Sequence, residues 1–406
     1  MLPIGRWLLL TLWLVAPARV VLANVITEWD EKAVAFLAPK MPPPLHEREL
    51  AMMHVAMFDA VNSIEPHYRP FFGRVPDAAG ASAEAAAAAA ASAILTRLHP
   101  ESAAEFQSAL QGTLSALPDG DAKSNGVRVG EAAAAKCLEA RANDGASMPD
   151  DYRPRAKPGV YIPTPLTVAS QWPHVRPFAL TDPSQFRPKP PISLNSAEWA
   201  KDYIEIKDYG GKNSSKRSAR QTEDARFWLA TGASTYHPLA RQIAIKKGLS
   251  VVDSARLMAL VSVATEDAYI AVMDAKYKYE FWRPITAIRN GDIDGNPQTD
   301  RDATWQPLDN TPMHPEYPCA HCITSAAAAT VIEKTVGMDG VSELTLTSTT
   351  APGVTHSWVN FKAYTDEVAE ARIWAGFHYR FSIRIGQEMG RQVGTYVAQT
   401  VMLPIK

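Results

Sequence analysis

Cysteine is scarce in this chain, which has three among 406 residues: Cys137, Cys319 and Cys322. A small secreted scaffold held together by disulfides is therefore excluded, and the odd count leaves at least one cysteine unpaired within the chain. Net charge is also small, because 41 basic and 43 acidic residues give −2 with no basic or acidic tail. The sequence therefore gives no reason to expect a nucleic acid or an anionic membrane as partner.

Long apolar runs are missing as well. The main one, residues 7–16, has about ten residues, half of the roughly 20 that a membrane-spanning helix needs. Arg6 precedes it, and Val21-Leu22-Ala23 follows as a cleavage signal. This pattern predicts a signal peptide over residues 1–23 and a secreted or periplasmic protein with no membrane span after cleavage. A retained anchor or a buried helix is the alternative.

What the chain does contain favours helix. Alanine runs are abundant and β-branched runs are few. Apolar residues recur at helical spacing over 24–145 and again over 195–406, whereas residues 146–194 are too rich in proline for regular helix. We therefore predict an all-α fold of two helical bundles joined by an irregular connecting segment that wraps over the surface. No repeat of fixed period is present.

Cations gather in the stretch KYKYEFWRPITAIR, residues 276–289. Lys276 and Arg283 are seven apart in a helical pattern that Pro284 ends or kinks. At about 100° per residue, both side chains lie on nearly the same helix face. The pair either converges on one anion or belongs to a solvated basic face.

A second candidate site begins at the sequence PCAHC. Prolines hold the approach extended, and an alanine-rich helix is expected to start near Cys319. The free amides of a first helical turn bind oxyanions. His321 lies in that turn and is either a general acid or base or a buried structural histidine. His314, seven residues earlier, is a second candidate.

The two cysteines of this stretch allow other chemistry. A redox C-x-x-C pair is one alternative, although the chain lacks the βαβ setting of a thioredoxin-like domain. A zinc site with His314 and His321 is another. A c-type haem is excluded, because Ile323 stands where the haem-binding histidine would follow the second cysteine.

The third candidate site lies in EARIWAGFHYR. Arg372 and His378 are six apart, which in a regular helix places them about 120° apart. Their convergence requires the length of the arginine side chain or an irregularity at Gly376.

Taken in order, these segments resemble the three-part signature of the vanadium-dependent haloperoxidase and type 2 phosphatidic acid phosphatase superfamily. That signature reads K-x6-R-P, then P-S-G-H, then S-R-x5-H-x3-D. The corresponding positions here are 276–284, 318–321 and 371–378. Three further segments are similar to bacterial haloperoxidases: 51–64, 176–191 and 283–300.

The resemblance implies a role for each matching residue. Lys276, Arg283 and Arg372 would neutralise the oxygens of vanadate. Cys319 and Ala320 occupy the positions that add hydrogen bonds to it. His378 would ligate vanadium, or attack phosphorus in a phosphatase, and His321 would be the acid–base partner of the apical oxygen.

The implied activity is oxidation of halide by hydrogen peroxide, with vanadium acting as a Lewis acid that keeps its oxidation state. A vanadate-like cradle also suits the phosphoryl-transfer transition state, so the first alternative is a phosphatase that binds phosphate and cleaves a phosphate ester. An inactive oxyanion-binding relative is the second alternative. Whether the protein forms a homo-oligomer is left open.

The chain departs from the signature at four positions: Cys319 replaces serine, Ala320 glycine, Ala371 serine and Ser382 the final aspartate. A thiol is a weaker donor than a hydroxyl, and as a thiolate it would repel the oxyanion. A disulfide between Cys319 and Cys322 would remove that problem. Ser382 cannot stabilise an imidazolium as the family's orienting aspartate would.

Residues 292–300, DIDGNPQTD, begin like a calcium-binding loop. The glutamate expected at the twelfth position is Ala303, so a plain acidic turn is favoured over a calcium site.

Overall fold

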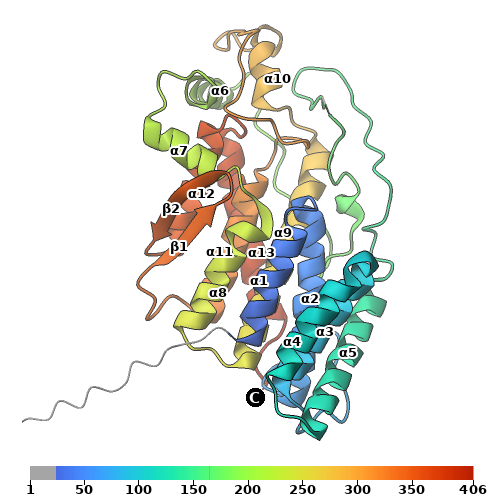
Figure 1. The fold of residues 1–406 in the computed structure, drawn as a ribbon. Helices are drawn as coiled ribbons and strands as arrows, with labels where there is room; N and C mark the ends of the chain where they lie inside the picture. Colours follow the sequence, from blue (N-terminus) through green and yellow to red (C-terminus); the bar gives the residue numbers. More distant parts are fainter. Residues whose placement is uncertain (1–23, 164, 406) are drawn as a thin grey trace, which may run out of the picture.

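The computed structural model describes residues 24–163 and 165–405, which form thirteen α-helices, short 3₁₀ turns and one β-hairpin. The first part of the chain holds α1 (Val25–Leu37), α2 (Pro43–Ile64), α3 (Ala83–Leu98), α4 (Ala103–Ser115) and α5 (Asp121–Arg141). The later part holds α6 (Ala197–Gly210), α7 (Ala219–Phe227), α8 (His237–Lys246), α9 (Val251–Tyr279), α10 (Pro284–Arg289), α11 (Ala320–Thr335), β1 (Leu344–Ser348), β2 (Ala351–Trp358), α12 (Phe361–Trp374) and α13 (Arg380–Thr400). Figure 1 shows α2 to α5 at one end and α6 and α10 at the other.

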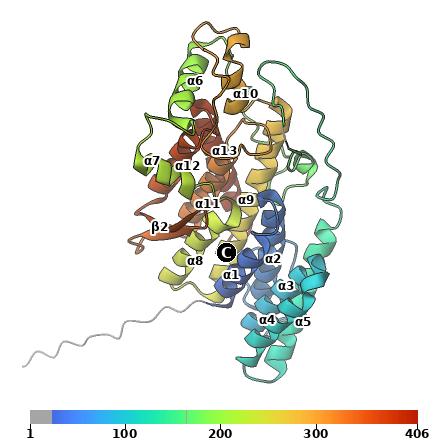
Figure 2. The ribbon, with the colours of Figure 1, turned by 45° about the horizontal axis from the view of Figure 1, so that its top comes forward.

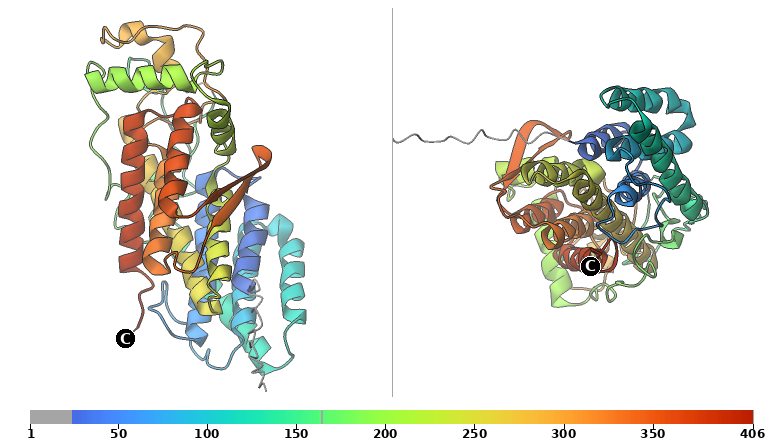
Figure 3. Two further views of the ribbon diagram at one scale, coloured as in Figure 1. Left: turned by 90° about the vertical axis from the view of Figure 1, so that its left-hand side faces the viewer. Right: turned by 90° about the horizontal axis from the view of Figure 1, so that it is seen from below.

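The mostly helical prediction is confirmed. The long helix α9 joins the two groups of helices, packing against α2 on one side and against α11 and α13 on the other. The domain boundaries drawn from the sequence remain a prediction. The hairpin β1–β2, seen in Figure 3, was not predicted. Its first strand, LTLTS, buries every second residue, a period-two signal that is short beside the helical patterns around it.

Glycine and alanine bring α11 and α13 unusually close, and this contact fixes the position of the candidate site. A Cβ added to Gly386, Gly390 or Gly394 of α13 would lie 2.7, 2.3 or 2.6 Å from a backbone carbonyl oxygen of α11 or of the residue that caps it. Real Cβ atoms do not approach so closely, so only glycine allows this spacing. The starts of α11 and α13 are thereby held together.

The connecting segment is irregular and ordered, as predicted. Its described residues within 146–194 contain only one short 3₁₀ turn, Trp172–His174, and no α-helix. It runs along one side of the molecule past α9 (Figure 2). The indole nitrogen of Trp172 donates to Glu266 on α9, and three successive backbone amides of the segment donate to Asp267. Buried polar contacts therefore fasten it to the long helix.

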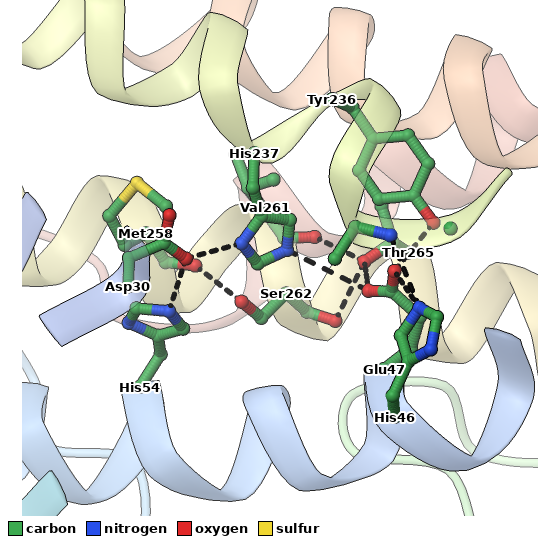
Figure 4. A network of polar contacts seen from close by, with 12 residues as sticks. Asp30, His46, Glu47, His54, Tyr236, His237, Met258, Val261, Ser262 and Thr265 are labelled. Carbon is green, nitrogen blue, oxygen red and sulfur yellow. Dashed lines mark hydrogen bonds and ion pairs between the residues drawn. The ribbon is translucent and has the colours of Figure 1, made fainter. Parts of the chain in front are cut away.

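A buried polar network connects α1, α2 and α8; we call it the Asp30 network, comprising Asp30, Glu47, His54, His237 and Arg241. Figure 4 shows its members Asp30, Glu47, His54 and His237. Asp30 contacts His54, His237 and Arg241. Burial alone lowers the pKa of His237, but Asp30 and Glu47 outweigh it and raise the pKa to about 9. The network thus combines two carboxylates with two cations and is electrically balanced.

The signal peptide predicted for residues 1–23 lies outside the described residues. Among the helices that are described, none has both the length and the apolar character needed to cross a bilayer.

Candidate functional site

The three motif segments meet where α9, α11 and α12 come together near the start of α13. Lys276 comes from the last turn of α9, Arg283 from the turn before α10, and Arg372 from the last turn of α12. His378 lies between α12 and α13. Lys276 is 0% exposed, and Arg283, Arg372 and His378 are each 1% exposed. Residues a hundred positions apart in the chain therefore share one buried site.

Lys276 and Arg283 do not lie on one helix face, so this prediction was wrong in its geometry. Helix α9 ends at Tyr279, and Glu280 takes a left-handed conformation with φ of 49°. The chain turns back there, and Arg283 reaches the site from outside the helix. Their convergence therefore results from a tight helix end that the helical pattern did not indicate.

Backbone carbonyls and histidines hold the two cations. The ammonium of Lys276 donates to the carbonyl oxygens of Pro315 at 2.8 Å and Glu316 at 2.7 Å. Arg283 donates through Nε to the carbonyl of His314 at 2.9 Å and through NH2 to its Nδ1 at 3.0 Å. His314 therefore positions an arginine, and its neutral ring adds no charge, because burial and the nearby cations hold its pKa well below its usual range.

Gly376 provides the irregularity that brings Arg372 and His378 together. Helix α12 ends at Trp374, and Gly376 has φ of 79°. A Cβ at Gly376 would lie 2.4 Å from the carbonyl oxygen of Gly210 on α6. Both the backbone conformation and the close approach require glycine here.

The site carries more positive than negative charge. Glu316 is the one carboxylate among the groups that act on the pKa values of Lys276 and Arg283. Arg372 is influenced by Arg283 and Tyr269 instead. Burial lowers the pKa of Lys276 well below its usual range, that of Arg283 to about 10 and that of Arg372 to about 9. The Nε of Arg372 is buried without a hydrogen-bond partner among the described residues. Buried charge without a counter-charge is costly, so this site favours a bound anion.

Glu316 is the functional residue that the sequence reasoning missed. Its carboxylate accepts from Nδ1 of His378 at 2.8 Å and from the amide of Tyr379 at 3.2 Å. Ser382, the position of the family's aspartate, is buried beside Glu316, and its hydroxyl makes no hydrogen bond of good geometry to the described residues. The orienting carboxylate thus comes from a residue five positions before His321, and its only sequence signal was its place between the prolines of HPEYP.

The ring of His378 is oriented with Nε2 facing the cations. Arg283 NH1, which can only donate, lies 3.2 Å from this Nε2, so Nε2 carries the lone pair and Nδ1 the proton. Burial first, and then the charges of Arg283, Lys276 and Arg372, hold the pKa of His378 well below its usual range. His378 is therefore neutral and able to ligate a metal centre or attack phosphorus through Nε2.

The start of α11 forms another wall of the site. Cys319 caps the helix, and His321 contributes a half-buried ring whose Nε2 lies 3.3 Å from the carbonyl of Ala230. The amides of Ala320 and His321 have no partner within the helix, as is general for a first turn. Burial and then Arg372 hold the pKa of His321 well below its usual range. A neutral His321 at this position can accept or return a proton.

Cys319 and Cys322 form a disulfide, and both are fully buried. Neither sulfur can then be a thiolate that repels an anion or ligates zinc. The disulfide also removes the sulfhydryl donor, so the position of the family's serine offers no hydrogen bond through its side chain. Cys137 is a buried free thiol.

Two other clusters contain carboxylates of the kind that bind metal ions. In the loop 292–300, the carboxylate of Asp294 already accepts from Trp199, from the amide of Asn296 and from Thr299. Those bonds describe an acidic turn that stabilises itself. In the Asp30 network, Arg241 and two histidines surround Asp30 at hydrogen-bonding distance, and the charges balance without a metal ion.

Comparison with known proteins agrees with this geometry. Residues 256–406 match the family model of the VCPO second helical-bundle domain. A 148-residue stretch is 31% identical to the vanadium chloroperoxidase of Curvularia inaequalis; it covers 30% of this chain and 24% of the relative's length. The resemblance drawn from the motifs is thereby confirmed.

Solved structures extend the likeness to nearly the whole fold. The first bacterial vanadium-dependent iodoperoxidase has a TM-score of 0.78 and 24% sequence identity, covering 94% of this chain and 96% of that one. A holo-type bacterial vanadium-dependent chloroperoxidase has a TM-score of 0.72 and 19% identity, covering 95% and 98%. At these identities the likeness establishes the fold.

Proposed function

We propose that this protein is a vanadium-dependent haloperoxidase-like enzyme that oxidises halide with hydrogen peroxide. The observation that carries the proposal is the uncompensated positive charge of Lys276, Arg283 and Arg372 beside the Nε2 lone pair of His378. An anion with several oxygens and an acceptor position for nitrogen satisfies both features at once. Vanadate has this chemistry, and the vanadium-dependent relatives support the choice.

Each residue has a defined task in this proposal. The three cations would balance the negative charge of vanadate, and the unpaired Nε of Arg372 is available to donate to it. His378 would hold vanadate through Nε2, while Glu316 fixes its ring and keeps the proton on Nδ1. His321 would accept and return a proton beside the bound group. Bound vanadate supplies a Lewis acid that activates peroxide without changing its own oxidation state.

A phosphatase uses the same cradle with different chemistry. There His378 attacks phosphorus and His321 protonates the leaving oxygen. The same geometry, a neutral nitrogen facing three cations, favours this second function too. The relatives named above favour the haloperoxidase. The relatives do not indicate which halide this protein oxidises, since they include both an iodoperoxidase and chloroperoxidases.

The deciding experiment uses one preparation in two assays. Vanadate-loaded protein receives peroxide with bromide or iodide, and halide oxidation is followed; vanadate-free protein receives a chromogenic phosphate ester. Halide oxidation that depends on vanadate supports the proposal. Ester cleavage inhibited by vanadate supports the phosphatase, and vanadate binding with neither activity supports an inactive relative.

Two variants assign the roles within the active enzyme. We expect His378→Ala to lose vanadate binding, measured by calorimetry, together with halide oxidation. His321→Ala should retain vanadate and lose turnover by about a hundredfold or more, the usual contribution of a general acid or base. Equal loss of vanadate in both variants would remove His321 from its proposed role.

A further inference from the structure

A large cleft adjoins the cationic site, and Arg283 belongs to both. The cleft has a volume of 990 Å³ and lies between the connecting segment, the end of α6, α10 and the loop 306–313. Halide and peroxide are far smaller than such a space, whereas organic ligands occupy clefts of about 300–1,000 Å³. The size of the cleft therefore indicates an organic molecule.

The charges in the cleft select an anion. Its lining contains three cations, Lys212, Arg283 and Arg289, and one carboxylate, Asp309. Arg289 donates through Nε to the carbonyl of Trp305 at 2.8 Å, and its two terminal nitrogens have no partner among the described residues. Lys212 is exposed, and its ammonium likewise has no hydrogen-bond or ion-pair partner among the described residues. Two cationic groups are thus free to bind an acidic group.

The cleft also has an apolar part that reaches the surface. Ile162 and Met313 are each 41% exposed, and both line the cleft together with Ile285 and Leu308. The amide of Val168 donates to the carbonyl of Met313 at 2.9 Å, which fastens the connecting segment to this wall. A ligand with an apolar body and one acidic group matches this mixed lining.

We propose that this cleft binds an organic acid, an apolar or aromatic molecule with a carboxylate, as the acceptor of the oxidised halogen. This inference rests on the proposed function and adds its substrate class. The carboxylate would lie between Lys212 and Arg289, and the body against Ile162 and Met313. The reacting carbon would then lie on the side of the cleft that Arg283 closes.

The reaction balances with reagents that the proposed activity already uses. Halide, peroxide and one proton give hypohalous acid and water, with the halide oxidised and the peroxide reduced. The electron-rich carbon of the acceptor then takes the halogen from oxygen, a carbon–halogen bond forms, and the carbon's proton leaves with the hydroxide as a second water. Binding of the acceptor beside the site makes this transfer local.

A matched pair of acceptors tests the proposal on the vanadate-loaded enzyme. Para-hydroxybenzoate and its methyl ester share one ring and differ in charge. We expect the KM of the acid to be about tenfold lower than that of the ester, and Lys212→Gln with Arg289→Gln to remove this difference. Oxidation of halide without an organic acceptor, followed by peroxide consumption, should be unchanged in the double variant. Lys201→Gln, an exposed lysine of α6, is the control.

Other outcomes overturn one proposal or the other. Equal KM values for acid and ester in the unaltered enzyme would mean that halogenation occurs by released hypohalous acid, and the acceptor site would be rejected. If halide oxidation itself is absent, the proposed function fails. Calorimetry with para-hydroxybenzoate then decides the cleft alone, because binding that Lys212→Gln with Arg289→Gln abolishes would retain the anion site, and no binding would reject it.

Discussion

The Asp30 network and the cationic site both bury several ionised side chains, yet only the first balances its charge. In the Asp30 network every carboxylate contacts a cation, and two negative charges meet two positive ones. In the cationic site three cations share one carboxylate, and backbone carbonyls take most of their hydrogen bonds. Carbonyl dipoles satisfy donors without cancelling charge. A balanced cluster stabilises the fold, whereas an unbalanced one is built for a ligand.

The largest expected effect comes from unbalancing the network. Asp30→Asn leaves His237 and Arg241 without their shared carboxylate, and losing one partner of a buried pair costs about 3–5 kcal/mol. Denaturant unfolding measures this loss. Glu31→Gln, an exposed neighbour on α1, is the control and should change little. A small effect of Asp30→Asn would show that the network does not depend on charge balance.

The pH dependence of the network should be the next largest effect. Folding raises the pKa of His237 from 6.5 to about 9, so the folded protein holds this proton more tightly. The stabilisation is complete below pH 6.5 and declines as the pH rises through about 9. At about 1.4 kcal/mol per pKa unit the loss is on the order of 3 kcal/mol. Melting temperatures should fall over this range, and His237→Gln should flatten that part of the profile.

Removing a cation from the cationic site should not lower the stability of the protein, in contrast to the effect of Asp30→Asn. Arg372→Met lowers the excess positive charge, so the vanadate-free protein should keep or gain stability. Vanadate affinity should fall by about 10- to 100-fold, the usual value of a charge-assisted hydrogen bond. Calorimetry measures the affinity and denaturant unfolding the stability, with Arg391→Met, at an exposed position of α13, as control. A loss of stability as large as that of Asp30→Asn would make Arg372 a structural cation.

The smallest of these expected effects comes from Glu316→Gln in the cationic site. Burial raises the pKa of Glu316 to about 7, with Lys276 and Arg283 opposing it. Because folding raises this pKa from 4.5, the folded protein holds the proton more tightly than the unfolded chain, and this contribution to stability is lost as the pH rises through about 7. Glu316→Gln cannot ionise, so its stability relative to the unaltered vanadate-free protein should rise by about 2 kcal/mol between pH 5.5 and pH 8.5. Denaturant unfolding at both pH values measures this change; a difference that is the same at both would contradict the assigned pKa.

The residue types of the site could be read from the sequence because the chemistry of oxyanion binding restricts them. Cations, histidines and a helix start at characteristic spacings were enough to select Lys276, Arg283, His321, Arg372 and His378. The helical fold also followed from alanine content and period. These features depend on residues close together in the chain, so they can be read directly from the sequence.

Long-range packing decided the rest. No spacing rule connects Glu316 with His378, and the left-handed turn at Glu280 follows a pattern that reads as continuous helix. The close contact of α11 with α13, the crossing of Gly376 over α6 and the cleft beside Arg283 all join segments distant in sequence. The sequence by itself thus determined which groups are candidates to bind an anion. Only the tertiary structure decided that their charges stay uncompensated, because charge balance depends on which side chains the fold brings within contact.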